Sequence, residues 1–494
     1  MADLHHTSSA QTSSQRFELT TTARTVLLSG VGLGVLSLLL VFFNDDPFHT
    51  RFWTNILLNT LFFTGIALFA LFKYSAGVVA FGGWFVGFKR IWEAYSLFLI
   101  VSLILLLVLA GGLYLGYHHL YHWNDAATAS SDRIISGKSG FLNKNFFTFF
   151  TIVALGIWIY LARKLRSISL DEDVRGDASY SHHKKLRHYS SLALPLIGFL
   201  SAAFFWLWLM SLDAHWYSTM FAWYSSASVF VAMLALTIGI ILYVKSKGYL
   251  QEVTAEHLHD LGKYTFAFSI FWTYLWFSQY MLIWYGNIGE ETIYFRTRFD
   301  HYKVLFYANL VLNFLLPFLI LMRNDTKRKT GTLVLVAILV FFGHWIDFFQ
   351  MVKPGALHTS HELIENRSSM GQLEQLEAKP MEVSQEEESH AGAAADTGHT
   401  GAVAGQNMDT AHSASEQAHE ASTEGHASTG NHGEDTHGGS GFVAGFTLPG
   451  LLDLGVMIGF LAGFLLFVFR EMGKAPLVPK NDPYYSESLH HHVM

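Results

Sequence analysis

The chain has 494 residues, of which 51% are apolar and only 14% are charged, whereas soluble proteins average about a quarter charged residues. Its mean hydropathy is +0.29, and long charge-free segments alternate with short charged ones. The sequence therefore predicts an integral membrane protein and excludes a string of soluble domains. The net charge of −7 is uneven, since 15 of the 39 acidic residues lie between Lys353 and Ser440. The absence of cysteine excludes disulfides, cysteine-ligated iron–sulfur clusters and c-type haem within this chain.

Ten segments are long enough to cross a bilayer, which takes about 20 apolar residues. The predicted fold class is therefore an all-α integral membrane protein with about ten transmembrane helices. The predicted spans are Thr25–Phe43, Trp53–Lys73, Ile91–Tyr117, Asn145–Ala162, Tyr189–Leu212, Thr219–Val244, Lys263–Tyr285, Tyr302–Met322, Gly331–Met351 and Phe446–Arg470. The apolar but glycine-rich segment Gly77–Phe88 is too short to cross, and we interpret it as an interfacial lead-in to the third span.

The positive charges between these spans predict the orientation, because cytoplasmic loops carry an excess of Lys and Arg. The two termini and the even-numbered connections hold 22 of the 32 Lys and Arg residues, so both termini are expected in the cytoplasm. The predicted parts are a cytoplasmic segment (1–24), a nine-span membrane domain (25–352), an outer loop (353–445), a tenth span (446–470) and a cytoplasmic tail (471–494).

The outer loop 353–445 has a composition of its own. Between Thr359 and Ser440 it consists mainly of Ala, Gly, Ser, Thr, Glu and His, with too few large apolar residues to bury a core, which predicts disorder. The nine histidines of the loop allow two interpretations. They bind copper, zinc or nickel loosely, or they belong to a solvated acidic insertion with no metal. We favour the second, and we predict no metal site.

Polar residues gather in the outer half of the membrane at the ends of the fifth, seventh and ninth spans. Because ionisable groups inside spans cost about 2.5–3.5 kcal/mol on insertion scales, they are functional candidates by default. We predict that they line one polar cavity near the outer surface, formed by Asp213, His215, Gln279, Tyr280, Glu290, Glu291, His344 and Asp347. The alternatives are solvated span ends for the acids and His215, and a helix–helix hydrogen bond for Gln279.

His344 and Asp347 are the strongest of these candidates. They lie three residues apart on the ninth span and so share a helix face. A neutral imidazole can donate a hydrogen bond to an ionised carboxylate and can take up a proton when one arrives. The pair is therefore predicted to transfer protons to the outer side, the alternative being a structural hydrogen bond.

At the cytoplasmic start of the third span, Arg90 and Glu93 have the same spacing. The simplest interpretation is a local ion pair with a structural role. The functional alternative is that the two residues take up protons from the cytoplasm. A b-type haem needs two facing histidines at matched depth. Only His344 lies well within a span, so we expect none.

Three runs of residues resemble a known family. The runs Ser211–Phe221, Phe271–Asn287 and Gly343–Asp347, together with the tail 481–491, are similar to the NrfD/PsrC-like membrane subunits of alternative complex III, a quinol:electron acceptor oxidoreductase. The similarity is greatest to the ActF type. It covers nearly all the spans and excludes the insertion at about 359–440.

The resemblance implies a fold of two four-helix bundles plus peripheral helices, in a bacterial inner membrane. It implies oxidation of menaquinol or ubiquinol, with bound quinone and lipids as the only small molecules in this subunit. Partners would be an ActC-type sister subunit, an iron–sulfur subunit, multihaem cytochrome c subunits, small membrane subunits and a terminal oxidase. The absence of cysteine fits a subunit with no redox centre of its own.

Three functions follow, in order of preference. The first is a quinol oxidoreductase subunit that supports quinol binding and proton transfer. The second is a proton-conducting or purely structural subunit without quinone, with Glu93, His344 and Asp347 as stations in the conducting case. The third is an unrelated secondary transporter. Such transporters place their binding groups at the membrane midplane, whereas the polar groups here lie in the outer third.

Overall fold

The computed structural model describes residues 16–125, 132–176, 180–377 and 448–492, with side chains throughout except over 360–377. Within these ranges every regular element is a helix, which confirms the predicted all-α class. Nine helical segments among them are long and apolar enough to cross a membrane. The chain divides into two units, residues 1–366 with 439–494 and residues 367–438, and everything below concerns the first.

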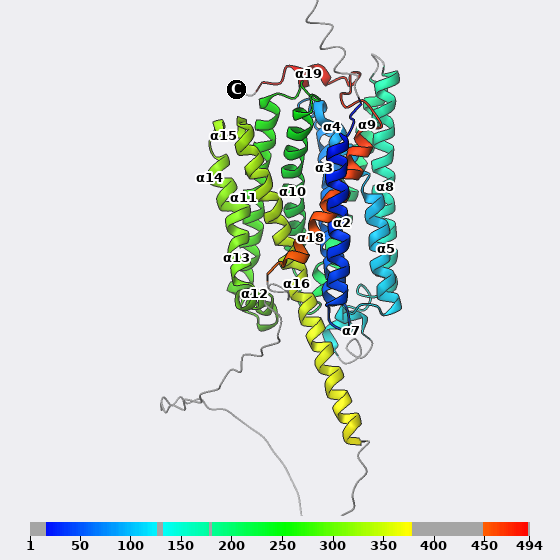
Figure 1. The fold of residues 1–494 in the computed structure, drawn as a ribbon, viewed down its shortest axis with the longest axis vertical. Helices are drawn as coiled ribbons and strands as arrows, with labels where there is room; N and C mark the ends of the chain where they lie inside the picture. Colours follow the sequence, from blue (N-terminus) through cyan, green and yellow to red (C-terminus); the bar gives the residue numbers. More distant parts are fainter. Residues whose placement is uncertain (1–15, 126–131, 177–179, 378–447, 493–494) are drawn as a thin grey trace, which may run out of the picture. The chain divides into compact units, whose positions relative to one another are not determined.

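The long helices of this unit run side by side (Figure 1). Those that form the nine segments are α2 (Thr21–Phe43), α3 (Thr50–Val79), α4 (Lys89–Ser96) with α5 (Leu99–Leu115), α8 (Lys144–Arg175), α9 (Ser181–Trp208), α10 (Met220–Ser246), α13 (Lys303–Leu310) with α14 (Leu316–Leu321), α16 (Thr330–Glu377) and α18 (Leu451–Met472). The shorter elements are 3₁₀ turns at Val86–Phe88, His122–Asn124 and Met210–Leu212, α7 (Arg133–Gly137), α12 (Gly289–His301), a π-helical turn at Val311–Leu315, α15 (Asn324–Arg328) and α19 (Tyr485–Leu489).

The seventh predicted span lies within α11 (Ala255–Gly286), a 32-residue helix that packs beside α10. The part of this helix that coincides with the predicted span is less apolar than the other nine segments because it contains Gln279 and many Tyr, Trp, Ser and Thr residues. Ten long helical segments therefore occupy the ten predicted positions in the described part of the chain, and nine of them have the hydropathy of a membrane span.

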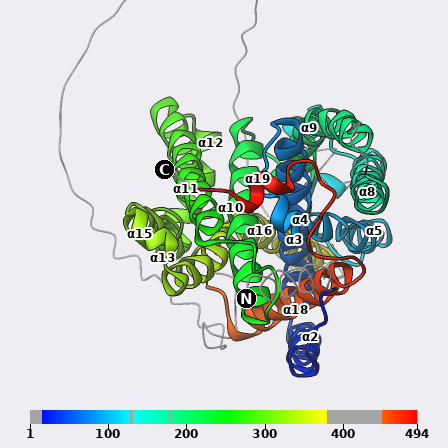
Figure 2. The same ribbon diagram turned by 90° about the horizontal axis from the view of Figure 1, so that it is seen from above.

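Two groups of helices can be followed in the view along the helices (Figure 2), and they meet where α10 packs on α3 and α9. In one group α3 packs on α5 and α9, and α8 packs on both α5 and α9. In the other, α10 packs on α11, and α11 packs on α14 and on the π-helical turn. Helix α16 joins this second group through the hydrogen bonds described below. Helices α2 and α18 pack against each other outside the two groups. This arrangement agrees with the expected pair of four-helix bundles with peripheral helices.

The contact between α2 and α18 depends on small residues. A Cβ added to Gly34 would lie 2.5 Å from the Cα of Gly459, and one added to Gly30 would lie 2.9 Å from the Cβ of Ala462. Close approach of backbones through such residues is how membrane helices associate where the lipid gives no hydrophobic driving force.

Both described ends of the chain lie at the same end of the bundle, where Arg16 pairs with Pro476 in an isolated β-bridge. This agrees with the prediction that the two termini share one side, which we call the inner end; the opposite end is the outer end. One boundary was predicted wrongly. Helix α16 does not end near Met351 but continues through Pro354 to Glu377, and Lys353 is fully buried in it rather than part of an aqueous loop. The predicted disorder of the remaining loop concerns residues 378–447, which lie outside the described residues.

Candidate functional site

Asp347 of α16 is fully buried and accepts hydrogen bonds from four neutral side chains on three other helices. Its Oδ2 accepts from Ser228 Oγ at 2.7 Å and from Trp272 Nε1 at 2.9 Å. Its Oδ1 accepts from Asn309 Nδ2 at 2.7 Å and from the Tyr224 hydroxyl. Each carboxylate oxygen thus has two donors, which fills the acceptor capacity of an ionised carboxylate.

No basic side chain forms an ion pair with Asp347 among the residues that the structure describes. Neutral dipoles alone therefore stabilise its charge. Trp and Asn side-chain N–H groups can only donate, so a proton on Asp347 must form its hydrogen bond by reversing the hydroxyl of Tyr224 or Ser228. The site can hold the charged form and has two hydroxyl groups through which a proton can enter or leave.

His344 reaches Asp347 only through Ser228. Ser228 Oγ lies 3.0 Å from His344 Nδ1, and Ser228 has one hydroxyl proton, which it donates to Asp347. His344 Nδ1 must then donate to Ser228, which leaves the lone pair on His344 Nε2. Nε2 is buried without a hydrogen-bond partner. The predicted direct hydrogen bond between the pair is therefore wrong, and a His–Ser–Asp–Tyr relay takes its place.

The surroundings hold this relay tightly. The ring of Trp272 stands edge-on to His344, with ring centroids 5.4 Å apart. Asn313, in the π-helical turn, donates to Asn309 at 2.5 Å, and its side-chain oxygen lies so close to Gly343 that a Cβ there would collide with it. Glycine at 343 is therefore required for α16 to approach the helix that carries Asn309. π-turns of this kind are frequent at functional sites.

A small cavity adjoins the relay on the outer side. It is lined by Tyr224, Gln279, Arg298 and Gln350 together with apolar side chains. The volume of the cavity is about 20 Å³. This is enough for one water molecule and far below the about 150 Å³ of an engineered cavity that binds benzene. The Nε2 of Gln279 is buried there without a hydrogen-bond partner, so it can donate to a water molecule in the cavity.

A stack of three side chains separates this small cavity from a second, outer pocket. The guanidinium carbon of Arg298 lies 3.3 Å from the ring centroid of Tyr294, and Tyr294 stacks on Trp216 with centroids 3.9 Å apart. Arg298 also donates to the carbonyl of Gln350 at 3.0 Å and contacts Asp213 Oδ2 at 3.4 Å. Arg298 lines the small cavity, and its carboxylate partner Asp213 lines the outer pocket.

The outer pocket has a volume of about 120 Å³ and contains three imidazoles, His122, His215 and His358. The ring of His122 lies 5.6 Å from that of His358 and 6.3 Å from that of His215. Burial, with the neighbouring histidines, lowers the pKa of His122 to about 4, so it is neutral at physiological pH. The hydrogen bond from His215 Nε2, at 2.5 Å, lowers the pKa of Asp132 below its ordinary value. No three ligands are already placed to hold a metal ion in the described chain.

The predicted single cavity is therefore wrong, because its members lie in several places. Asp213, His215 and Glu290 line the outer pocket, Gln279 lines the small cavity, and His344 and Asp347 are buried behind it. Tyr280 packs on Phe295 and Phe299, and Glu291 is half-buried in the first turn of α12. The sequence missed the donors of Asp347 and the Arg298 stack. The sequence feature that could have indicated the donors is a pair of polar residues four positions apart inside a span. Tyr224 with Ser228 is one such pair, and Asn309 with Asn313 is another.

A second polar cluster lies at the inner end, around the predicted pair Arg90 and Glu93. Arg90 Nη1 contacts Glu93 Oε2 at 2.5 Å, which confirms the local ion pair. Arg90 also pairs with Asp173, and Ser169 donates to Glu93 Oε1 at 2.7 Å. The cluster contains four carboxylates and three cations, all buried or nearly so: Glu93, Glu172, Asp173 and Asp482 with Lys89, Arg90 and Arg166.

One carboxylate of this inner cluster is in excess over the cations. Lys89 Nζ lies 2.5 Å from Asp482 and 3.7 Å from Glu172, so the stronger pairing belongs to Asp482. Glu172 Oε2 is buried without a hydrogen-bond partner. Glu172 is therefore the acid of the cluster best placed to bind a proton, a role that the sequence gave no reason to assign.

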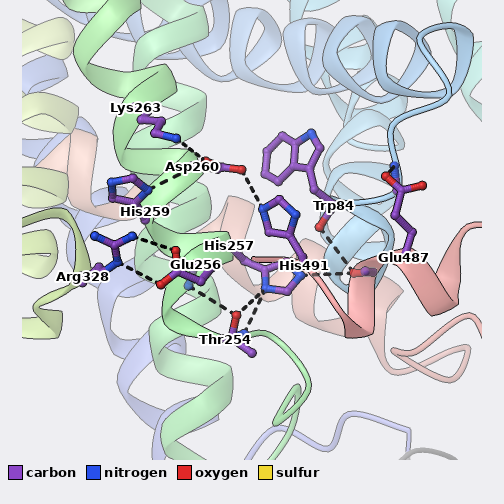
Figure 3. Close-up of polar contacts among 12 residues, drawn as sticks. Trp84, Thr254, Glu256, His257, His259, Asp260, Lys263, Arg328, Glu487 and His491 are labelled. Atoms are coloured by element: carbon purple, nitrogen blue, oxygen red, sulfur yellow. Dashed lines mark hydrogen bonds and ion pairs between the residues drawn. The ribbon is translucent and has the colours of Figure 1, made fainter. Parts of the chain in front are cut away.

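The C-terminal tail is fixed across this inner end (Figure 3). His491 Nε2 contacts Asp260 Oδ2 at 2.8 Å. His257 Nδ1 accepts from the Thr254 N–H at 3.1 Å, so its Nε2 donates to Ser488 Oγ at 3.2 Å. The tail also supplies Asp482. Burial disfavours the charge of Asp482, but the ammonium group of Lys89, the backbone N–H of Tyr484 and His183 together outweigh burial and hold the pKa of this carboxyl below its ordinary value.

Comparison with known proteins adds no assignment. No family model matches the sequence, and no curated protein matches it.

Proposed function

We propose that the chain is a membrane subunit of a quinol:electron acceptor oxidoreductase of the alternative complex III type, and that it transfers protons to the outer side of the membrane. The three runs that carry the family resemblance meet around one site. Asp347 of the run Gly343–Asp347 accepts from Trp272 of the run Phe271–Asn287. Asp213, of the run Ser211–Phe221, pairs with Arg298 at the edge of the same region.

The observation that carries the proposal is the environment of Asp347. A carboxylate at this depth costs a few kcal/mol and persists where it has a function. Here it has no cationic partner among the described side chains, and it is linked to a basic His344 nitrogen through Ser228. Its donor Tyr224 is one of the residues that line a water-sized cavity. A proton taken up at His344 Nε2 can move along the relay to Asp347 and leave through Tyr224.

The inner cluster is the matching uptake point. Glu172 can bind a proton from the cytoplasmic side because it shares its cation, Lys89, with the closer Asp482. Further buried polar side chains lie between this cluster and the membrane interior. One of them is Thr237, whose hydroxyl oxygen accepts a hydrogen bond from Trp92 Nε1 at 3.1 Å. Glu93, Arg90, His344 and Asp347 keep the proton-transfer roles proposed from the sequence, and Glu172, Ser228 and Tyr224 join them.

The test is the variant Asp347→Asn in the purified complex. Quinol oxidation should fall about 10-fold or more, since a positioned proton-transfer group contributes ~10²–10⁴-fold. The subunit composition should stay unchanged. Wild-type turnover in this variant would make Asp347 a structural acceptor and the chain a scaffold.

A quinol site within this chain is the second candidate function, favoured by the outer pocket. Its about 120 Å³ comes near the space an aromatic ring requires, and His215 and Asp213 offer acceptors for a quinol hydroxyl. A photoreactive quinone should label residues of α12 or the segment 212–216. Labelling confined to other subunits would remove this candidate and leave the proton-transfer proposal standing.

A further inference from the structure

A large open groove lies between α8 and α9 at the inner end, and none of its lining residues belongs to the relay or to the inner cluster. Its volume is about 940 Å³. The contributing residues of α8, from Lys164 to Arg175, recur every three or four positions and so share one face of the helix. The same holds for α9 between His182 and Tyr189. Two helix faces therefore form the walls.

The groove is strongly basic. It is lined by four permanent cations, Lys164, Arg175, Lys184 and Lys185, and by His182 and His188, against a single acid, Asp171. Asp171 is already occupied, because Arg175 Nε and His182 Nε2 both lie 3.1 Å from it.

The three lysines have no carboxylate partner among the described side chains. Lys184 and His188 also line an adjoining cavity of about 420 Å³, to which Arg187 adds a further cation. The surplus positive charge thus extends over two connected hollows.

The depth of the groove points to a lipid rather than a soluble anion. Lys164 follows the first residue of α8, Lys144, by 20 residues, which at about 1.5 Å per residue is roughly 30 Å, the thickness of the hydrocarbon core. Lys164 therefore lies where the headgroups begin, 5.5 Å from the ring centroid of Tyr189, an aromatic of the interfacial type. On the membrane side of this level, Tyr160 and Leu192 are exposed and offer apolar surface to acyl chains.

We infer that the groove between α8 and α9 is a binding site for an anionic phospholipid. The phosphate binds Lys164, Lys184 and Lys185, and the acyl chains run along the exposed apolar faces of the two helices. Basic pockets between membrane helices on the cytoplasmic side recognise phospholipid headgroups by this chemistry. The site is independent of the proposed proton transfer, since it shares no residue with the relay or with the inner cluster.

The test uses the full chain, purified in detergent and stripped of lipid, with binding measured by native mass spectrometry. Dioleoyl phosphatidylglycerol should bind at least about 10-fold more tightly than dioleoyl phosphatidylcholine. The triple variant Lys164→Gln/Lys184→Gln/Lys185→Gln should weaken binding of phosphatidylglycerol roughly 100-fold, at about 1 kcal/mol per basic residue. The triple variant with Arg at the same three positions keeps the charge and should still bind phosphatidylglycerol. It shows that the chain folds when these lysines are replaced.

A control triple removes the same charge at the same end, outside the groove: Lys247→Gln/Arg323→Gln/Lys329→Gln. It should bind phosphatidylglycerol as the wild type does. Equal binding of the two lipids, unchanged binding by the Gln triple, or an equal loss in the control triple would overturn the inference. Displacement of the lipid by millimolar inorganic phosphate would also overturn it, since the groove would then bind a soluble anion.

Discussion

Asp347 shows how a carboxylate is kept inside a membrane-spanning segment. Insertion of an acid at this depth costs about 2.5–3.5 kcal/mol, and four hydrogen bonds to a charged group, each worth about 1.5–3 kcal/mol net, are enough to offset it. The four donors come from α10, α11 and α13, so the same bonds hold these helices to α16. The proposed proton-transfer role would therefore be combined with a structural role in one residue.

Ser228→Ala is the sharpest change at this scale, because it removes the link between His344 and Asp347 without altering either. Turnover of the complex should fall about 10-fold. The free energy of unfolding should fall by about 1–3 kcal/mol, because the N–H donor at His344 Nδ1 loses its acceptor. The matched control is Ser225→Ala, one turn away on α10. Ser225 bonds only the Phe221 carbonyl and Met351 sulfur. Equal effects of the two variants would show that the relay has no role beyond packing.

His344→Phe and Asp347→Asn should not add. If the two residues act in one relay, the double variant should turn over at about the rate of the slower single variant. The amide nitrogen at 347 replaces an oxygen that accepts from one hydroxyl and one N–H group. The hydroxyl can reverse and accept, but the N–H donor loses its bond, so complex yield serves as the check on folding. Additive losses, measured under the same conditions, would mean that the two residues work independently.

The residues predicted to line one outer cavity were grouped wrongly, whereas the ion pair of Arg90 with Glu93 was predicted correctly. His344 and Asp347 stand out in a sequence because charge is rare inside spans, and Arg90 with Glu93 because their spacing is local. The partners Tyr224, Ser228, Trp272 and Asn309 lie on other helices, and only the packing of those helices brings them to Asp347. Arg298 was passed over for the same reason: at the sequence level it is one charge in a connecting segment.

At the scale of the element, the C-terminal tail is held by one buried ion pair and several weaker contacts. Asp482→Asn should release it, at a cost near the lower end of the about 3–5 kcal/mol that breaking a buried pair incurs, since Glu172 remains within 3.7 Å of Lys89. Limited proteolysis should then cleave the tail at least about 10-fold faster. The variant Lys480→Gln, at an exposed position, serves as the control. If the two variants were cleaved at the same rate, the ion pair of Asp482 would not hold the tail, and its attachment would depend on the contacts of α19.

The pKa of Asp482 gives the pH dependence of this attachment. A carboxyl whose pKa in the folded protein lies below the ordinary 3.8 stabilises the fold above that value, and the contribution disappears as the pH falls through the folded pKa. The tail should therefore stay protected at neutral pH and become susceptible only below about pH 4. Release already at pH 6 would show that a group other than Asp482 controls the attachment.

The long outer loop is the element on which the sequence and the structure differ most. The extension of α16 to Glu377 places the boundary of the insertion later than the sequence indicated, because a helix can continue past Lys353 when that lysine is buried near Asp453, at 3.6 Å. Deleting 378–440, which holds few large apolar residues, should leave assembly and quinol oxidation intact. Loss of a subunit on deletion would make the segment a docking element, and zinc bound by the intact chain but not by the deletion would support the metal interpretation.

At the scale of the whole molecule, the fold followed from hydropathy, because span length and apolar composition are local properties. In the proposed function the electron carriers belong to partner subunits, because this chain has no cysteine to hold an iron–sulfur cluster or a c-type haem. Purified from its native membrane, it should bring with it cysteine-rich partners that hold iron–sulfur and haem groups. Haem absorbance or iron–sulfur paramagnetism in the isolated chain would contradict the proposal.

The most direct measurement is the number of protons released per electron by the complex in sealed proteoliposomes, with a pH indicator on the outer-face side. If Asp347 hands protons to the outer side, Asp347→Asn should lower this ratio relative to the wild type, while Ser225→Ala should leave it unchanged. An unchanged ratio and turnover in Asp347→Asn would contradict the account, and the buried carboxylate would be a structural acceptor that holds four helices together.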